Sequence, residues 1–228
     1  MTDMPCARVD VLIPTFNRGD MLPECLRSIL NQTEQDFRIV IYDDGSTDGS
    51  TDPGSIPDDP RIEIYNRGGE HKGVAAARNA LLGLITAPFA CWQDSDDRSH
   101  QERLERMVSH LEREGSDAAF SYLNFFNGSW SQKHWHLCVV DTSKWRVPDE
   151  NGDPADWGMR NNTSFASGFF RKELAETKFD VSFRVAEDWD WIKRLIQQGF
   201  RITTEPKVYY YARRHPGRLT VQARRRRQ

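Results

Sequence analysis

The strongest constraint on the fold of this chain is the alternation of buried strands and amphipathic helices over its first 115 residues. Short apolar runs predict four strands, at Val9–Ile13, Phe37–Tyr42, Arg61–Tyr65 and Pro88–Gln93. Apolar residues at helical spacing predict helices from Pro23 to about Asn31, over about 73–86, and from about Ser99 to Gly115. Ser99 and Glu102 have the spacing of a capping box at the start of the third helix. This alternation is typical of a mostly parallel sheet with right-handed crossovers.

Three polar segments come directly after predicted strands. They are Pro14–Arg18, Asp43–Asp48 and Asp94–Asp97. In an open parallel sheet, ligands bind beyond the carboxyl ends of the strands. We therefore expect the three segments to converge on one binding site, and this coincidence is the most informative feature of the sequence.

The composition is typical of one globular domain. The chain has 228 residues, of which 38% are hydrophobic, which is enough to fill a core and excludes global disorder. No apolar run approaches the ~20 residues that cross a bilayer, and the polar segment before Val9 lacks the pattern of a signal peptide. The cysteines lack the paired spacing of zinc sites or redox dithiols, so we expect reduced thiols in a cytoplasm. They are Cys6, Cys25, Cys91 and Cys138.

Charge is distributed unevenly along the chain. The formal net charge is −3, but residues 213–228 contain seven arginines and no acidic residue. Residues 1–212 therefore carry a net charge of −10. We expect no nucleic-acid partner for so acidic a body. The basic tail, residues 221–228, is either a solvated terminus or a peripheral contact with anionic lipid at the cytoplasmic face of a membrane.

Carboxylates are clustered directly after two of the predicted strands, where they indicate either a ligand-binding site or a tight turn. Asp94, Asp96 and Asp97 repel one another unless a cation or helix amides compensate their charge. A Mg²⁺ or Mn²⁺ site that binds a diphosphate and an acidic turn ahead of a helix both stay open. Asp43 and Asp44 offer a similar choice between a plain turn and a contact with a base imide or ribose hydroxyl. Neither a dinucleotide-binding glycine loop nor a P-loop is present.

The second half of the sequence is less regular, but it contains two candidate functional residues. A predicted helix over about 187–198 opens with Glu187 and Asp188, and Asp188 falls on the apolar stripe of that helix. Asp188 is either a favourable acid in a first helical turn or a positioned general base. His215 follows a predicted strand at about Val208–Ala212 and, taken alone, is typical of a surface turn.

Taken together, five short motifs resemble those of the family 2 inverting glycosyltransferases, which have the GT-A fold. Each motif is unspecific by itself, but their order and spacing match across about residues 8–217, nearly the whole chain. The matching segments are Ile13–Arg18, Tyr42–Asp48, Gly73–Asn79, Gln93–Asp97 and Ala186–Asp188.

The resemblance implies a single GT-A domain over residues 1–220, with a mostly parallel α/β sheet flanked by helices. About residues 1–97 would form a Rossmann-like nucleotide-sugar half, and about residues 98–220 an acceptor half. Asp96 and His215 would hold Mn²⁺ or Mg²⁺, with Asp97 as an alternative to Asp96. The nucleotide-binding residues would be Pro14, Thr15, Asn17, Arg18, Asp43, Asp44, Arg78 and Asp94.

The resemblance also implies a reaction. Asp188 would remove a proton from an acceptor hydroxyl while the oxygen attacks the anomeric carbon of the sugar and the diphosphate leaves from the opposite face. The acceptor would be a saccharide or glycolipid in bacterial-type polysaccharide or glycoconjugate synthesis, and the favoured donor a UDP-sugar. Acceptor contacts would come from Trp130, Trp135, Trp157 and Glu187.

Two other functions remain open at this point. A nucleotidyltransferase would use a similar sheet, but its opening loop rich in glycine and arginine with a lysine is absent, and Pro14–Arg18 stands in its place. A catalytically inactive nucleotide-sugar binding module would have lost the base or the metal carboxylates, and both are present. A processive synthase is not expected, because the chain lacks the membrane helices and long extensions of polymerising members.

Overall fold

The computed structural model describes residues 7–126, 135–136, 165–183 and 186–216. Its strands are β1 (Val9–Thr15), β2 (Phe37–Asp43), β3 (Ile62–Tyr65), β4 (Phe89–Trp92), β5 (Arg98–Ser99), β6 (Ala118–Phe126), β7 (Trp135–His136), β8 (Phe169–Arg171) and β9 (Ile202–Arg213). Its helices are α1 (Leu22–Leu30), α2 (Val74–Leu82), α3 (Arg103–Glu114) and α4 (Glu187–Gln197), with 3₁₀ turns η3 (Phe165–Ser167) and η4 (Lys172–Glu176). Within these described segments, no helix is both long and apolar enough to cross a membrane.

The described strands form one sheet in the order β3-β2-β1-β4-β8-β6-β9-β5, with β7 beside β6. β1 pairs in parallel with β2 and β4, and β2 with β3, so the parallel sheet expected from the first half is confirmed. In the second half, β8 runs antiparallel between β4 and β6, and β5 runs antiparallel to β9. β6 and β9 are parallel to each other. The predicted α/β class is therefore confirmed, and the complete sheet is mixed.

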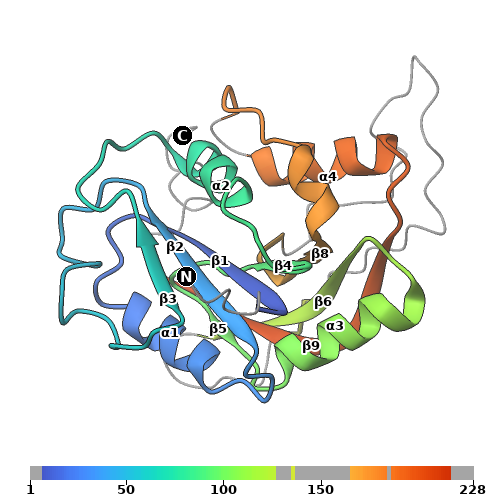
Figure 1. Cartoon of the computed structure of the whole chain (residues 1–228), viewed down its shortest axis with the longest axis horizontal. Coiled ribbons are helices and arrows are strands. Elements are labelled where there is room, and N and C mark those ends of the chain that lie inside the picture. Colours follow the sequence, from blue (N-terminus) through green and yellow to red (C-terminus); the bar gives the residue numbers. More distant parts are fainter. Residues whose placement is uncertain (1–6, 127–134, 137–164, 184–185, 217–228) are drawn as a thin grey trace, which may run out of the picture.

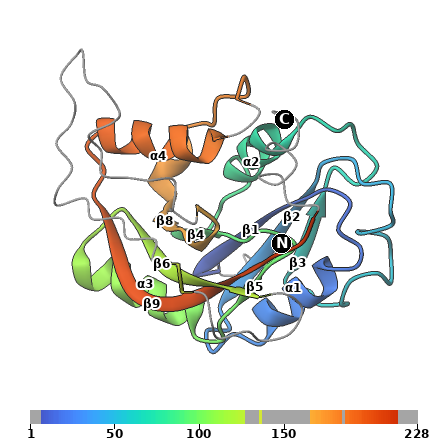
Figure 2. The same ribbon diagram turned by 180° about the vertical axis from the view of Figure 1, so that it is seen from behind.

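Helices cover both faces of the sheet: α2 and α4 lie on one face, and α1 and α3 on the other (Figures 1 and 2). The alternation of side chains along β1 divides the core in the same way. Leu12 belongs to the cluster that contains Leu81 of α2 and Trp191 of α4, whereas Val11 and Ile13 belong to the cluster with α1 and α3. Because both faces of these strands are buried, they appear in the sequence as unbroken apolar runs.

β1 runs two residues further than its apolar run predicts, through Pro14 to Thr15. A proline is tolerated there because β1 pairs with β4 only from Val9 to Leu12, so no donor is needed on that side further along. On the other side, the Thr15 carbonyl accepts a hydrogen bond from the Asp44 N–H (2.9 Å). β1 therefore leads the first polar segment directly to the carboxyl edge of the sheet.

The predicted capping box at the start of α3 is wrong. α3 begins at Arg103, and its N-cap residue Glu102 makes no side-chain capping bond. Ser99 lies in β5, where its hydroxyl donates to Gln93 Oε1 (2.7 Å) and accepts from Arg103 Nη1 (2.9 Å). Arg103 is fully buried, and a buried cation without acceptors costs far more free energy than an uncapped helix end. The hydroxyl of Ser99 therefore accepts a hydrogen bond from the buried arginine and does not cap the helix.

Candidate active site

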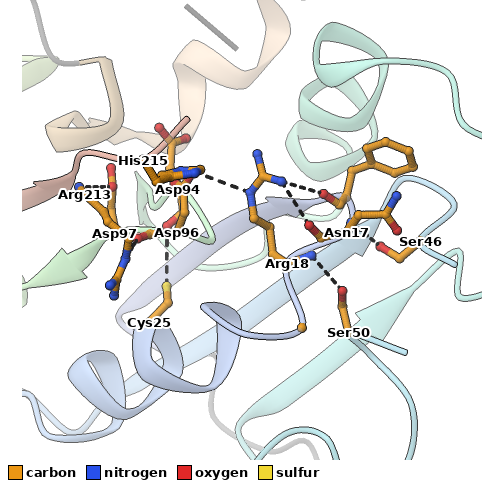
Figure 3. A network of polar contacts seen from close by, with 12 residues as sticks. Asn17, Arg18, Cys25, Ser46, Ser50, Asp94, Asp96, Asp97, Arg213 and His215 are labelled. Carbon is orange, nitrogen blue, oxygen red and sulfur yellow. Dashed lines mark hydrogen bonds and ion pairs between the residues drawn. The ribbon is translucent and has the colours of Figure 1, made fainter. Parts of the chain in front are cut away.

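The strand order reverses between β1 and β4, which is where an open α/β sheet binds ligands. The polar segments that begin at Pro14 and Asp94 lie on either side of this reversal, and β2 brings the segment from Asp43 alongside. Figure 3 shows side chains from all three segments in one network of polar contacts, together with residues at the end of β9. The structure thus brings together the three segments that the sequence analysis singled out.

The loop after β1 is tied to the loop after β2 around Asn17. The Asn17 N–H donates to Ser46 Oγ (2.9 Å), and the Asn17 side-chain carbonyl accepts from the Thr47 N–H (2.8 Å). Asn17 has a φ of 51°, a left-handed conformation that asparagine tolerates better than most residues. The Arg18 N–H donates to Ser50 Oγ (2.8 Å), and its guanidinium donates to the Asn17 carbonyl (3.0 Å). These bonds hold the two loops as one unit (Figure 3).

Asp43 and Asp44, predicted to line a nucleoside pocket, are both buried. Asp43 accepts hydrogen bonds from the Ser46 N–H (2.8 Å) and from the Thr51 hydroxyl. Asp44 accepts from the N–H groups of residues 72–73 (2.8 Å each), at the N-terminus of α2. Both carboxylates therefore hold the surrounding loops, and base recognition by either of them stays a prediction.

The wall of this predicted pocket is closely packed. Gly45 has a φ of 83°, and a Cβ there would lie 2.7 Å from the Gly69 carbonyl and 2.8 Å from the His71 nitrogen, so only glycine fits. Thr15 is 2% exposed, and its hydroxyl has no hydrogen-bond partner among the described residues. Pro14 beside it is half-buried. The predicted nucleoside contacts thus lie on backbone that has little freedom to move.

Asp94, Asp96 and Asp97 form a compact turn after β4, in which one carboxylate oxygen of each lies within 4.8 Å of the others. Asp97 is 2% exposed, and its oxygens accept from the Tyr210 hydroxyl (2.9 Å) and the Arg213 N–H (2.7 Å) on β9. The Tyr210 hydroxyl also accepts from the Asp94 N–H (3.1 Å). Asp97 therefore anchors the turn to β9, and the side chains of Asp94 and Asp96 are the more exposed, at 38% and 15%.

Asp96 is the residue at which distant parts of the chain meet. His215 Nε2 lies 2.8 Å from Asp96 Oδ2, although 119 positions separate the two residues. Arg18 Nε lies 3.5 Å from the same oxygen, and Arg213 Nε donates to the Asp96 carbonyl (2.9 Å). The structure thus brings His215 to the aspartate turn (Figure 3). Carboxylate oxygens with one imidazole are donors that suit Mn²⁺ and, through the oxygens, Mg²⁺, so the residues present fit such a cation.

Two buried groups beside the turn keep their protons. Burial and the neighbouring Asp97 raise the pKa of the Tyr210 hydroxyl well above its ordinary value of 10.0. Burial, with Asp97 and Asp96, raises the pKa of the Cys25 thiol well above 9.0, and Cys25 Sγ lies 3.5 Å from the Asp94 carbonyl oxygen. At neutral pH, Tyr210 is therefore a hydrogen-bond donor to Asp97, and Cys25 is not a reactive thiolate.

A buried ion pair joins α2 to α4. Arg78 Nη1 donates to Glu187 Oε1 (2.6 Å), and Arg78 Nη2 lies 3.8 Å from Asp94 Oδ1. Arg78 and Glu187 are each 6% exposed. Asp188, the next residue, is half-buried in the first turn of α4, and its carboxylate accepts from the Trp189 N–H (2.7 Å). The predicted nucleotide contact of Arg78, acceptor contact of Glu187 and base role of Asp188 stay predictions.

Several predicted contacts lie outside the described residues. These include the acceptor residues Trp130 and Trp157 and the basic tail 221–228. For Trp135 the structure describes only the backbone, which pairs with Asn124 as part of β7.

Two residues that hold the aspartate turn from β9, Tyr210 and Arg213, were not among those expected at the site. Neither residue has a local pattern that distinguishes it from its neighbours on the strand. The one available signal is their place just before His215, since a strand that delivers a site residue also passes close to the site.

Comparison with known proteins agrees with this geometry. A family model described as Glycosyl transferase family 2 matches residues 10–178. The chain is 31% identical over 195 residues to glycosyltransferase GlyG of Streptococcus pneumoniae serotype 4, a match that covers 80% of this chain and 62% of that protein. It is 26% identical to the GalNAc(5)-diNAcBac-PP-undecaprenol beta-1,3-glucosyltransferase of Campylobacter jejuni, over 89% of this chain and 64% of the relative. The chain thus spans less than two thirds of either relative.

Solved structures show the same fold. S. aureus TarS 1–349 in complex with UDP-GlcNAc superposes with a TM-score of 0.67 at 18% identity, covering 93% of this chain and 60% of that one. The mannosyltransferase PcManGT of Pyrobaculum calidifontis, in complex with GDP-Man and Mn²⁺, gives a TM-score of 0.64 at 21% identity, over 90% and 56% of the two chains. At these identities the likeness shows the fold alone, which is of the GT-A type. The family model, in contrast, covers well over half of the sequence. This chain therefore belongs to glycosyl transferase family 2.

Proposed function

We propose that this chain transfers a sugar from a nucleotide-diphosphate sugar to an acceptor hydroxyl, with inversion at the anomeric carbon and a UDP-sugar as the favoured donor. The observation that carries the proposal is the convergence of Asp94, Asp96 and His215 where the strand order reverses. The solved neighbours support a nucleotide-sugar donor, since they were determined with UDP-GlcNAc and with GDP-Man.

Asp96, with His215 beside it, would hold Mn²⁺ or Mg²⁺. Asp97 is the weaker candidate, because both of its carboxylate oxygens already accept hydrogen bonds from β9. A bound divalent cation would neutralise charge on the departing diphosphate. Arg18 would contact the same diphosphate, since it lies 3.5 Å from Asp96 and on the loop that leads to the nucleoside side. Asp94, the most exposed of the three carboxylates, would contact the ribose.

Asp188 would act as the general base at the tip of α4. Its carboxylate would take the proton of the acceptor hydroxyl as that oxygen attacks the anomeric carbon from the face opposite the diphosphate. The hydrogen bond from the Trp189 N–H fixes the orientation of one carboxylate oxygen and leaves the other for the proton. A positioned base accelerates transfer by about 10²–10⁴-fold.

The acceptor in this proposal is a saccharide or glycolipid of a bacterial-type polysaccharide or glycoconjugate. Two relatives support it by name, the Campylobacter jejuni enzyme above and the poly(ribitol-phosphate) beta-glucosyltransferase of Bacillus spizizenii. The proposal also includes a cytoplasmic site of action and a peripheral membrane contact through residues 221–228. The family match argues against a nucleotidyltransferase.

Binding of UDP tests the donor site directly. We expect calorimetric titration of the wild type to show much tighter UDP binding with Mn²⁺ than with a chelator. Asp96→Ala should abolish this enhancement and keep the wild-type melting temperature. Asp36→Ala is a matched control, because Asp36 is an exposed acid at the opposite, amino end of β2. Equal affinity with metal and with chelator in the wild type would mean that the aspartates form a plain turn, and would overturn the proposal.

A further inference from the structure

The ion pair between Arg78 and Glu187 is almost completely buried, and aromatic side chains surround the guanidinium. The central carbon of the Arg78 guanidinium is 4.5 Å from the ring centre of Phe165 and 5.6 Å from that of Phe179. The side chains of Arg78 and Glu187 are 7% and 8% exposed. Arg78 Nε is buried with no hydrogen-bond partner in the part of the chain that the structure describes. In such surroundings water screens the attraction weakly, and either charge left alone is strongly unfavourable.

Among the described residues, this pair is the polar side-chain contact between the N-terminal tip of α4 and another element. Its N-cap residue, Ala186, has a left-handed φ of 68° and makes no side-chain capping bond. One turn later the helix is well anchored, because the Trp191 indole N–H donates to a backbone carbonyl (2.5 Å). Glu187 and Asp188 precede that anchor. Two contacts with other elements therefore orient the tip: Trp189 packs against the apolar core, and Glu187 forms the ion pair with Arg78 of α2.

The same guanidinium also reaches the donor side of the site. Its second terminal nitrogen lies 3.8 Å from Asp94 Oδ1, so one planar group spans from the tip of α4 to the aspartate turn. A planar guanidinium holds two carboxylates at a fixed separation more strictly than a flexible ammonium would. We propose that Glu187 is a positioning residue that, through Arg78, fixes Asp188 relative to Asp94. This inference rests on the proposed function, in which Asp188 is the base and Asp94 contacts the donor.

A double-mutant cycle separates positioning from mere stability. The variants are Glu187→Gln, Arg78→Met and the two together. Each single variant removes one charge of the buried pair and should melt several degrees below the wild type, although in Glu187→Gln the Arg78 guanidinium keeps its contact with Asp94 (3.8 Å). The double variant removes both charges of the pair, so its melting temperature should recover most of the difference from the wild type. Turnover is measured as metal-dependent hydrolysis, in which water is the acceptor of the sugar, with whichever of UDP-glucose, UDP-GlcNAc and GDP-mannose the wild type hydrolyses fastest.

If Glu187 acts by positioning Asp188, the rate of transfer should not recover when the stability of the protein recovers. We expect kcat to fall by about 10²-fold in Glu187→Gln, with the donor KM changed only a few-fold, because the Glu187 carboxylate is paired with Arg78 and would not contact the donor. The double variant should regain stability and remain slow. Because Arg78 is also a predicted nucleotide contact, the donor KM of Arg78→Met shows how much of the loss comes from that contact. Asp190→Asn is the matched control: it removes an acid from the same turn of α4, but one that pairs with Arg194 of its own helix (2.8 Å), and its kcat should be near that of the wild type.

Each other outcome counts against a specific claim. If the double variant regains kcat together with its melting temperature, or if Glu187→Gln turns over normally, the pair is only structural and the inference is wrong. If Asp188→Asn turns over normally in the same assay, or the wild type turns over none of the three donors, the proposed function fails instead. Where a single variant fails to fold, the double variant carries the test.

Discussion

Replacement of Tyr210 by phenylalanine tests how the aspartate turn is held. The substitution keeps the fully buried ring and removes the hydroxyl that donates to Asp97 (2.9 Å) and accepts from the Asp94 N–H (3.1 Å). A hydrogen bond to a buried charged group contributes about 1.5–3 kcal/mol. We therefore expect the free energy of unfolding to fall by about 2 kcal/mol, which lowers the melting temperature of a domain of this size by about 4–8 °C.

The same change should weaken metal-dependent binding. Asp94 and Asp96 are unchanged in the variant, but the turn that carries them loses its hydroxyl anchor on β9. Groups that orient metal ligands typically change metal affinity by about 10–100-fold when they are removed. We expect the Mn²⁺-dependent affinity for UDP, measured by calorimetry, to fall by about tenfold. Urea denaturation of the same samples measures the loss of stability.

Tyr209→Phe is the matched control, because it removes a hydroxyl from the adjacent residue of β9. The ring of Tyr209 packs edge-on against His100 (5.7 Å between ring centres), and within the described part of the chain no hydrogen bond joins its hydroxyl to Asp94 or Asp97. This variant should bind UDP and Mn²⁺ like the wild type. If Tyr210→Phe unfolds at the wild-type urea concentration and keeps the wild-type UDP affinity, the hydroxyl does not hold the turn and the reasoning is refuted.

Two further predictions concern pH and the tail. Burial raises the pKa of the Cys91 thiol from 9.0 to about 12, so above pH 9 the unfolded chain loses this proton more readily than the folded one. The free energy of unfolding should then fall by about 1 kcal/mol per pH unit as pH rises from 9 toward 12. The urea midpoint of Cys91→Ala should therefore fall less steeply between pH 8 and 10 than that of the wild type. Equal slopes of urea midpoint against pH in the two proteins would contradict this. Removal of residues 221–228 should leave turnover of a soluble acceptor nearly unchanged. If a kinetic assay shows that this turnover is lost, the tail contributes to the active site.

The first half of the fold could be predicted from local pattern, because both faces of its strands are buried and its helices have a single apolar face. The strand at Phe37–Asp43 and the helix at Val74–Leu82 follow from those periodicities. The convergence of Asp43 and Asp94 follows as well, since parallel strands end at one edge. The mixed pairing of β5, β8 and β9 could not be predicted in this way, because these strands are far apart in sequence and no local pattern identifies which strands pair.

Contacts that local spacing does not encode explain the features of the site that could not be predicted from the sequence. His215 was linked to Asp96 only through the family resemblance, and the structure brings the two together across 119 positions. The partner of Glu187, Arg78, lies 109 positions away and was expected to contact a nucleotide. Ser99 fits a local capping motif, but the buried Arg103 takes its hydroxyl instead. In the last two cases a buried charge takes the partner, and the local spacing of residues does not encode that choice.

The rate of transfer by Asp188→Asn tests most directly whether Asp188 is the general base. The substitution keeps the size of the side chain and the hydrogen bond from the Trp189 N–H, and removes only the proton acceptor. We expect a fall in transfer rate of about 10²–10⁴-fold, with UDP affinity in the presence of Mn²⁺ within a few-fold of the wild type. Near-normal turnover would contradict the assignment of Asp188 as the base, and loss of UDP binding together with turnover would show that Asp188 maintains the structure of the site instead.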